Sequence, residues 1–228
     1  MRPTVLLFDI DGTLITTGGV GRQALKLAFE RRYGRTDVVT FPLDGMTDRR
    51  IARMGIEAIG ETASDAAIDE ILSLYLDVLE EQVKLADPTR YRLHTGMTEA
   101  IAHARDHGCG IGLGTGNIRE GARIKLSRVG VFDSFAFGGF GSDAEERVEI
   151  IRHGAERGAQ HLGAKLADCR VVVIGDTPKD VAAAKGIGAE CIGVGTGSFG
   201  ADALLACGAT FAFNSLSEVG ALEAIVGT

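Results

Sequence analysis

The sequence predicts an α/β fold: a doubly wound, mostly parallel sheet into which a group of helices is inserted. Short apolar runs alternate with segments of helical periodicity along most of the chain, the pattern that parallel sheets produce. One stretch, from about Thr16 to Arg92, has helical periodicity and no convincing strand. The 228 residues are 45% hydrophobic and 24% charged, which is enough for a sizeable core. This length suits one domain with an insertion, or two small domains.

Six apolar runs are the expected strands of the sheet. They are Val5–Phe8, Gly110–Leu113, Phe135–Phe137, Val171–Ile174, Glu190–Val194 and Thr210–Phe213. Helix starts are expected where Asp143 is followed by Glu146, and Ser215 by Glu218, because both pairs have the spacing of a capping box. A proline and two glycines also mark helix ends: Pro178 in a first turn, and Gly108 and Gly130 after last turns.

The inserted segment is expected to contain three helices. Two are Val20–Tyr33 and Thr47–Ile59. The third carries apolar side chains at helical spacing: Ile68, Ile71, Leu72, Tyr75, Leu79 and Val83. We interpret this stripe as packing rather than as a cofactor site. The expected hinges are Gly18-Gly19 and Leu93–Gly96, where the insertion joins the sheet.

Two acidic residues follow the first strand directly. Asp9 and Asp11 close the run Val5–Phe8 and are followed by Gly12 and Thr13. Alternate residues of a strand point the same way, so two carboxylates converge at the end of the strand where parallel sheets bind ligands. Two like charges so placed are costly unless a cation or a proton lies between them. The alternative is a polar turn that closes a core strand, which the buried run and the Gly-Thr pair disfavour.

Two later strands also end in polar residues, which parallel pairing would bring to the same edge. Thr115 and Asn117 follow one strand, and Asp176 follows another, with Asp180 four residues later. Taken alone, Thr115 is more often a turn residue, and Asp180 can simply cap the helix that begins near Pro178. A third acid at a strand end indicates a hard cation, and oxygen ligands with no His or Cys nearby favour Mg²⁺ over zinc.

These strand ends resemble the motifs of the haloacid dehalogenase-like (HAD) hydrolase superfamily. Phe8-Asp9-Ile10-Asp11-Gly12-Thr13-Leu14 is similar to its first motif, Gly114-Thr115-Gly116-Asn117 to its second, and Gly175-Asp176-Thr177-Pro178-Lys179-Asp180 to its fourth. The motif order and the helical insertion after the first strand resemble members with a helical cap of the phosphoglycolate-phosphatase type. The resemblance implies a Rossmann-like catalytic core formed by residues 1–15 and 93–228, and a cap formed by residues 16–92.

The resemblance also implies a role for each motif residue. Asp9 would attack phosphorus and carry an aspartyl-phosphate, and Asp11 would protonate the leaving oxygen and then activate water. Asp9, the main-chain carbonyl of Asp11, and Asp176 would hold Mg²⁺, while Asp180 would orient the site. Thr115 would bind the transferring phosphoryl group. The expected substrate-binding residues are Gly12, Thr13, Gly116, Asn117 and Thr47.

The chain departs from the family pattern at the third motif, which normally supplies a lysine, often followed by proline. No Lys-Pro pair occurs between the second and fourth motifs. Lys165 is too close to the fourth motif, and Lys125 is too close to the second. Arg147 stands at the expected distance, and its guanidinium can grip two phosphoryl oxygens. The alternative is a solvated arginine paired with a neighbouring acid, and Arg152 is a weaker candidate for the role.

Together with this resemblance, the residues favour a Mg²⁺-dependent phosphatase that hydrolyses a small phosphorylated metabolite, either phosphoglycolate-like or a sugar phosphate. A phosphomutase on the same scaffold would share Asp9 and Asp11, but its cap would have to retain a bisphosphate. The intact set of acids argues against a non-catalytic binding protein, and dehalogenation does not need the second acid or the metal. The loop Asp44–Asp48, followed by Arg49 and Arg50, is expected to face the site; exposed helix charges are the alternative for the two arginines.

Composition argues against several other partners. The net charge of −7 argues against a nucleic-acid binder. No apolar run approaches the roughly 20 residues that cross a bilayer, and the N-terminus shows no signal peptide. The four cysteines have no CxxC spacing, which favours reduced thiols in a cytoplasmic protein. We therefore expect a cytoplasmic monomer or homodimer that binds neither nucleic acid nor membrane.

Overall fold

The computed structural model describes residues 2–227, which contain a six-stranded parallel sheet. The strands lie in the order β5-β4-β1-β6-β7-β8, and every pairing in this sheet is parallel. Their bounds are β1 Thr4–Phe8, β4 Gly110–Gly114, β5 Phe137–Gly139, β6 Arg170–Gly175, β7 Glu190–Val194 and β8 Phe211–Phe213. The chain builds outward on both sides of β1, and sheets of this class bind ligands where the strand order reverses. The predicted fold class is confirmed.

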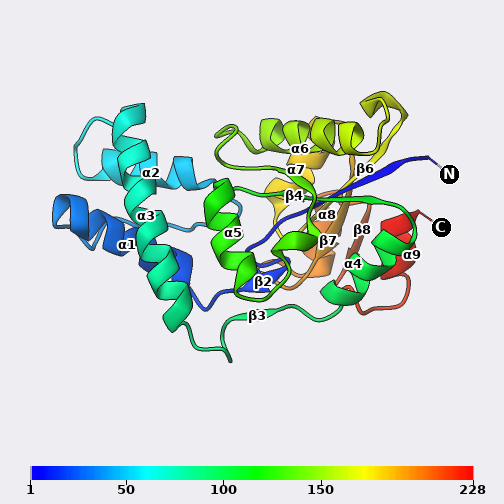
Figure 1. Cartoon of the computed structure of the whole chain (residues 1–228), viewed down its shortest axis with the longest axis horizontal. Coiled ribbons are helices and arrows are strands. Elements are labelled where there is room, and N and C mark those ends of the chain that lie inside the picture. The colour runs from blue at the N-terminus through cyan, green and yellow to red at the C-terminus, as the bar shows by residue number, and fades with distance from the viewer. Residues whose placement is uncertain (1, 228) are drawn as a thin grey trace.

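Helices cover both faces of the sheet (Figure 1). Their bounds are α4 Met97–Asp106, α5 Arg119–Ser127, α6 Arg147–His161, α7 Pro178–Gly186, α8 Ala201–Ala206 and α9 Ala221–Val226, with short 3₁₀ turns at Phe132–Ser134 and Leu166–Asp168. Alternate residues of β1 point into two cores: Leu6 and Phe8 into one, and Val5 and Leu7 into the other. This two-sided burial explains why β1 reads as a continuous apolar run.

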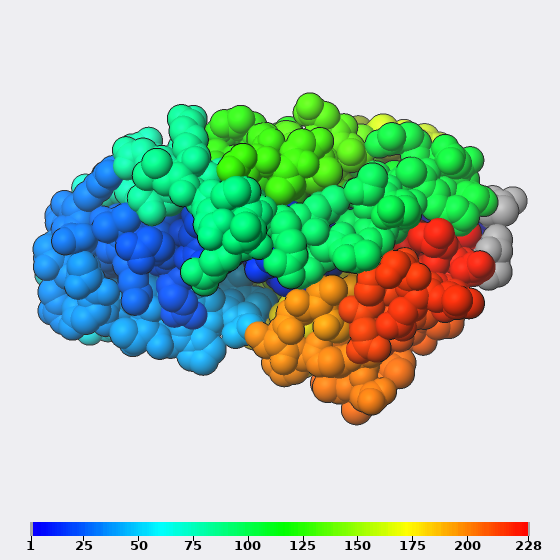
Figure 2. Space-filling model, turned by 90° about the horizontal axis from the view of Figure 1, so that it is seen from below, coloured from blue at the N-terminus to red at the C-terminus, as the bar shows by residue number. Residues whose placement is uncertain are grey.

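The insertion consists of three helices, called here the cap helices: α1 Val20–Tyr33, α2 Asp48–Ala58 and α3 Asp65–Leu85. They form one end of the molecule, coloured blue to cyan in Figure 2, and the C-terminal segments lie at the other end. The aliphatic stripe on α3 is buried against the other cap helices, as predicted. A short antiparallel pair, β2 Ile15–Thr16 and β3 Arg92–Leu93, joins the insertion to the sheet. Each of these strands has two residues, too few to show a pattern in the sequence.

Both predicted capping boxes are wrong. The helix α6 begins at Arg147 after Glu146, and the carboxylate of Asp143 instead accepts a hydrogen bond from the Phe140 amide and pairs with Arg157. Ser215 and Glu218 accept amide hydrogen bonds within the turn that precedes α9, from Ser217 and Asn214 respectively. In both places, the side chains accept hydrogen bonds from main-chain amides of the loop that precedes the helix.

Asp180 does cap α7, the alternative that the sequence left open, and it does so as part of a capping box. The amide of Thr177 donates to the Asp180 carboxylate, while Pro178 occupies the first turn as predicted. The glycines expected at helix ends, Gly108 and Gly130, have φ values of 69° and 72°, the left-handed backbone that favours glycine after a last turn.

The strand β5, the third of the six-stranded sheet in chain order, begins at Phe137 rather than at the predicted Phe135. Phe132–Ser134 forms a 3₁₀ turn, and the chain enters the sheet only after it. Gly138 and Gly139 look like turn residues in the sequence, but both pair with β4, and a Cβ at Gly139 would clash with the Ile150 carbonyl of α6.

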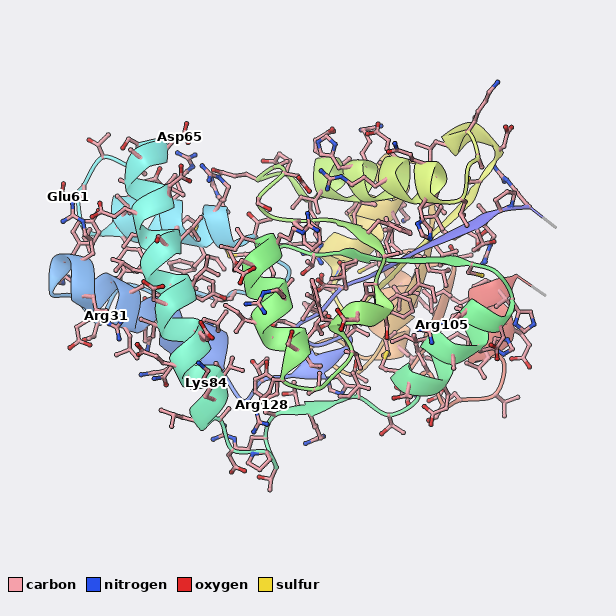
Figure 3. The ribbon with its side chains drawn as sticks, in the orientation of Figure 1. Arg31, Glu61, Asp65, Lys84, Arg105 and Arg128 are labelled. Carbon is pink, nitrogen blue, oxygen red and sulfur yellow. The ribbon has the colours of Figure 1, made fainter. Side chains whose placement is uncertain are left out.

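Charged side chains project from the outer surfaces of the cap helices, as Arg31, Asp65 and Lys84 do in Figure 3. Several of them form exposed ion pairs, for example Arg31 with Glu81. Between residues 2 and 227, the structure has no helix long and apolar enough to span a bilayer.

Candidate active site

The loop after β1 places two acids at the carboxyl end of the central strand. Asp9 is 3% exposed, and Asp11 lies in the tight turn that follows. Gly12 adopts φ +86°, and a Cβ at this position would lie 2.3 Å from a carboxylate oxygen of Asp176, so only glycine fits. The Thr13 hydroxyl donates to Asp176 Oδ1 at 2.8 Å. The turn therefore fastens the first motif to the end of β6.

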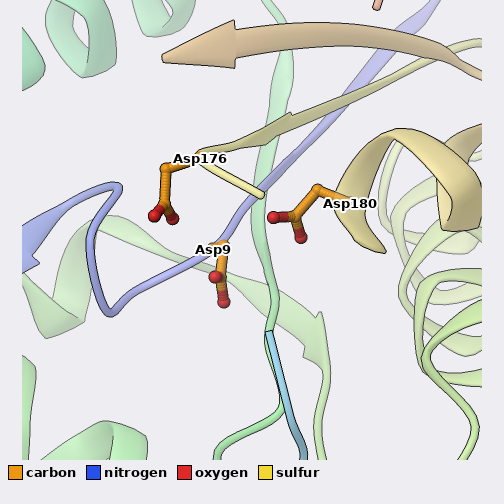
Figure 4. Close-up of side chains that lie close together, drawn as sticks. All are labelled: Asp9, Asp176 and Asp180. Carbon is orange, nitrogen blue, oxygen red and sulfur yellow. The ribbon is translucent and has the colours of Figure 1, made fainter. Parts of the chain in front are cut away.

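Three carboxylates meet beside this turn. Ligand atoms of Asp9, Asp176 and Asp180 lie within 4.8 Å of one another (Figure 4). Burial, with the charges of the other two acids, raises the pKa of Asp176 to about 8. Burial also raises the pKa of Asp9 to about 6, although the Arg147 cation opposes that shift. Such shifts show the free-energy cost of gathering buried like charges, a cost that a bound cation offsets.

The oxygens of this cluster differ in their availability to a metal. Asp180 uses both oxygens within the protein: Oδ2 accepts from Thr177, and Oδ1 accepts from Arg147. Asp9 Oδ1 is buried and has no hydrogen-bond partner in the described part of the chain. Asp176 Oδ2 likewise has no protein donor among residues 2–227, since Thr13 binds only Oδ1. Asp9 and Asp176 therefore fit a hard cation with oxygen ligands, and Asp180 holds the site together.

Arg147, the first residue of α6, reaches Asp9, the expected nucleophile. It is 8% exposed, its Nε donates to Asp180 Oδ1 at 2.8 Å, and its Nη2 lies 2.9 Å from Asp9 Oδ2. Burial alone would lower the pKa of Arg147, but the Asp180 and Asp9 charges outweigh it and raise that pKa. Arg152, the weaker candidate, is partly exposed and pairs with Glu149. The structure thus brings Arg147 into the site and leaves Arg152 outside.

The second motif forms a hydrogen-bonded loop at the end of β4. Thr115 is fully buried, and its hydroxyl oxygen accepts from Asn117 Nδ2 at 2.9 Å. The same Asn117 nitrogen donates to Asp11 Oδ2 at 2.8 Å. Gly116 and Asn117 line the cavity, whereas Thr115 lies behind them. In the described arrangement Thr115 supports Asn117, and its expected contact with a phosphoryl group stays a prediction.

Sequence reasoning missed Lys125, which it had set aside as too close to the second motif. Lys125 is 4% exposed, and its Nζ lies 2.7 Å from Asp11 Oδ2 and 2.6 Å from Asn117 Oδ1. Burial lowers the pKa of Lys125, but the charges of Asp11 and Asp48 outweigh it, so the pKa is raised and the ammonium stays charged. The only sequence signal is that Lys125 stands at helical spacing from two small residues, Gly121 and Ala122, whose burial the structure reveals.

A cavity of about 320 Å³ extends from the acids to the cap helices. Its cap side includes Arg22 of α1, Tyr75 of α3 and Met46 of the loop before α2. Arg22 donates through Nη1 to the carbonyls of Val39 and Phe41, both at 2.9 Å, and pairs with no acid among the residues described. A cavity lined by both the sheet and the cap suits a small ligand held between them.

The expected loop does face the site. Asp44, Gly45, Met46 and Asp48 line the cavity. Asp48 fastens the start of α2 to the second motif, because its amide donates to the Gly116 carbonyl at 2.8 Å and its carboxylate accepts from the amide of Ile118 at 2.9 Å. Burial raises the pKa of Asp48 to about 6 against the opposing charge of Lys125.

Besides Thr115, four residues expected near the substrate are not part of the cavity lining: Thr13, Thr47, Arg49 and Arg50. Thr47 caps α2, where its hydroxyl accepts from the amide of Arg50, and it is not part of the lining. Arg49 pairs with Asp65 and Asp69 on α3, and Arg50 is exposed. The two arginines are therefore helix charges, the alternative that the sequence left open.

A family model described as haloacid dehalogenase-like hydrolase matches residues 3–188. A curated relative, "Probable phosphatase IndB" of Dickeya dadantii (strain 3937), is 26% identical and covers 99% of this chain and 96% of its own.

Solved structures share the fold. A predicted phosphatase from Clostridium acetobutylicum has a TM-score of 0.71 at 17% identity, with all of both chains covered. A mutant of CbbY from Rhodobacter sphaeroides, in complex with xylulose-(1,5)bisphosphate, has a TM-score of 0.72 at 19% identity and covers 96% of each chain.

Proposed function

The chain belongs to the haloacid dehalogenase-like hydrolases, and from this membership and its site we propose that it is a Mg²⁺-dependent phosphatase of a small phosphorylated metabolite. The observation that carries the proposal is the position of Asp9. Its carboxylate is buried between the Arg147 cation and the free carboxylate oxygen of Asp176, and Asp11 follows on the same cavity wall. A nucleophile, a second acid and a fixed cation are the groups that phosphoryl transfer to a carboxylate needs.

In the proposed reaction, an Asp9 oxygen attacks phosphorus. The bond from phosphorus to the ester oxygen breaks, and Asp11 gives its proton to that oxygen, which leaves as an alcohol. Arg147 stabilises the charge on the phosphoryl oxygens in the transition state. Asp11, now a carboxylate, then takes a proton from the water that hydrolyses the aspartyl-phosphate on Asp9.

A divalent cation would be held by Asp9, Asp176 and the main-chain carbonyl of Asp11. It would supply positive charge that offsets the repulsion between these acids and an anionic ester. The orphan Asp9 Oδ1 and the raised pKa of Asp176 support a cation at this position. All-oxygen donors favour Mg²⁺ among the common metals.

The proposed cap comprises residues 16–92, with residues 1–15 and 93–228 as the core. Its helices close one side of the cavity, and Asp48 binds the core in the described arrangement. We propose that this cap opens at Gly18-Gly19 and Leu93–Gly96 to admit substrate and excludes water when closed. The four free cysteines support a reducing location such as the cytoplasm, and a monomer or homodimer suffices because the cavity is complete in one chain.

The test is turnover of 4-nitrophenyl phosphate and of a panel of phosphorylated acids, sugars and nucleotides, with Mg²⁺ and after EDTA treatment. Asp9→Asn should leave at most about a thousandth of the activity, because no other group replaces a covalent nucleophile. Asp11→Asn should lose roughly 10²–10⁴-fold. Exposed Asp202→Asn on α8 is the matched control and should behave as wild type. Robust turnover by Asp9→Asn would refute the mechanism. Conversion of a bisphosphate to its isomer without phosphate release would indicate a phosphomutase.

A further inference from the structure

A buried lysine lies beside the second acid and has no part in the reaction steps above. Lys125 comes from the core helix α5 and is 4% exposed. A buried ammonium is costly unless its donors are satisfied. Two of its three donors are used, toward Asp11 Oδ2 at 2.7 Å and Asn117 Oδ1 at 2.6 Å. The position of this cation is therefore set by the acid and by the second motif together.

The hydrogen bonds on Asp11 fall on only one of its oxygens. Lys125 Nζ and Asn117 Nδ2 both donate to Oδ2, at 2.7 Å and 2.8 Å. Oδ1 has no partner in the chain between residues 2 and 227. An oxygen that already accepts from two donors is a poor place for a proton. Protonated Asp11 therefore carries its proton on Oδ1, and its carboxyl group is fixed in one orientation.

The lysine is itself held by several parts of the fold. The Tyr91 hydroxyl, from the segment that returns from the cap, donates to the main-chain carbonyl of Lys125 at 2.9 Å. Asn117 is fixed in turn by the buried Thr115. Near the start of α1, a Cβ at Gly21 would lie 3.3 Å from Lys125 Nζ, so the cap helix approaches the ammonium closely. Lys125 has little freedom to leave Asp11.

We propose that Lys125 is a positioning residue that directs the Asp11 proton toward the leaving oxygen; the proposal rests on the phosphatase function. Lys125 keeps its own protons throughout. As the bond from phosphorus to the ester oxygen breaks, the Oδ1 proton of Asp11 passes to that oxygen and the carboxyl becomes a carboxylate. The adjacent ammonium stabilises the negative charge that develops there.

This role predicts a dependence on the leaving group. An alkoxide is a poor leaving group and needs a proton in the transition state, whereas 4-nitrophenolate leaves without one. A lysine that only stabilised the fold would affect both esters equally. The readout is kcat/KM, because it covers the steps up to the first irreversible one and so excludes the later hydrolysis of the aspartyl-phosphate.

The experiment compares Lys125→Met with wild type on 4-nitrophenyl phosphate and on the best alkyl ester among 2-phosphoglycolate, glycerol 3-phosphate and fructose 6-phosphate. We expect about a 10²-fold loss in kcat/KM on the alkyl ester and little change on the nitrophenyl ester. Lys125→Arg restores the charge and should show a smaller loss with the same selectivity. It also serves if the methionine variant does not fold.

Two controls separate positioning from stability. Ile225→Ala removes a fully buried side chain of α9 and should lower the melting temperature without changing the ratio of the two esters. Lys185→Met removes an exposed lysine that binds a loop carbonyl and should change neither. Equal losses on both esters in an active enzyme overturn the Lys125 proposal alone. A wild-type protein that hydrolyses no ester overturns the phosphatase proposal itself.

Discussion

Replacing Arg147 tests whether one arginine does the work of the missing third-motif lysine. Among residues 2–227, Arg147 forms the single ion pair to Asp9, with Nη2 2.9 Å from Oδ2. A phosphoryl group spreads negative charge over three outer oxygens in the transition state, and Arg147 lies where that charge would develop. Arg147→Ala should therefore cost about 10²–10³-fold in kcat/KM, the effect of losing one preorganised donor.

A second consequence follows from the acids that Arg147 faces. Burial raises the pKa of Asp9 to about 6 even with Arg147 in place. Without the guanidinium, that pKa rises further, so less of the nucleophile is ionised at neutral pH. At subsaturating Mg²⁺ the variant should therefore recover part of its activity as the pH rises above 7, because a proton on Asp9 competes with the metal. Breaking a buried ion pair also costs about 3–5 kcal/mol unless the acids take up protons.

The assay is kcat/KM on 4-nitrophenyl phosphate between pH 6 and pH 9, with melting temperatures measured in parallel in Mg²⁺. Arg147→Lys should regain part of the loss, since the charge returns without the planar fork. Arg152→Ala is the matched control, because Arg152 lies on the same helix and pairs only with Glu149 in the described structure. An Arg147→Ala enzyme with near-normal kcat/KM would refute this reasoning, as would an equal loss in Arg152→Ala.

Three further predictions concern the metal, the acids and the cap. Asp176→Ala should steeply raise the Mg²⁺ concentration needed for half-maximal activity, or abolish turnover. EDTA should abolish the activity of the wild type, and normal activity after chelation would exclude a role for the metal. In metal-free protein, the raised pKa of Asp176, about 8, means that the folded state binds its proton more tightly than the unfolded state. This contribution to stability is complete below about pH 4 and is lost as the pH rises to about 8. In EDTA, Asp176→Asn should therefore have a higher melting temperature than the wild type at pH 8.5 but not at pH 4. The same difference in melting temperature at both pH values would contradict this. Arg22→Met should raise KM about 10–100-fold for esters whose leaving group bears a second anion and spare 4-nitrophenyl phosphate; a uniform change would deny Arg22 a selective role.

The sequence predicted the parts of the fold that periodicity and strand-end chemistry encode. A strand buried on both faces must be apolar throughout, so β1 and β6 were visible, and acids that follow such strands must lie at one edge of a parallel sheet. The meeting of Asp9, Asp176 and Asp180 follows from that rule. Helix starts were less visible, because Asp143 and Ser215 satisfy loop amides with the same chemistry that a cap would use.

Lys125 shows why the rest of the site could not be predicted from motif spacing. The distance along the chain from the second motif says where a family lysine should be, but the α5 helix turns this side chain back toward Asp11, 114 residues earlier in the sequence. Its helical spacing from Gly121 and Ala122 indicates only that the charge is buried. A buried charge needs an oppositely charged partner, but the spacing does not show which residue that is. The partner is fixed by β1 and β4 lying side by side, which brings Asp11 and Asn117 to one edge of the sheet. Residues whose role depends on two strand ends and one helix face become visible only once the strand order is known.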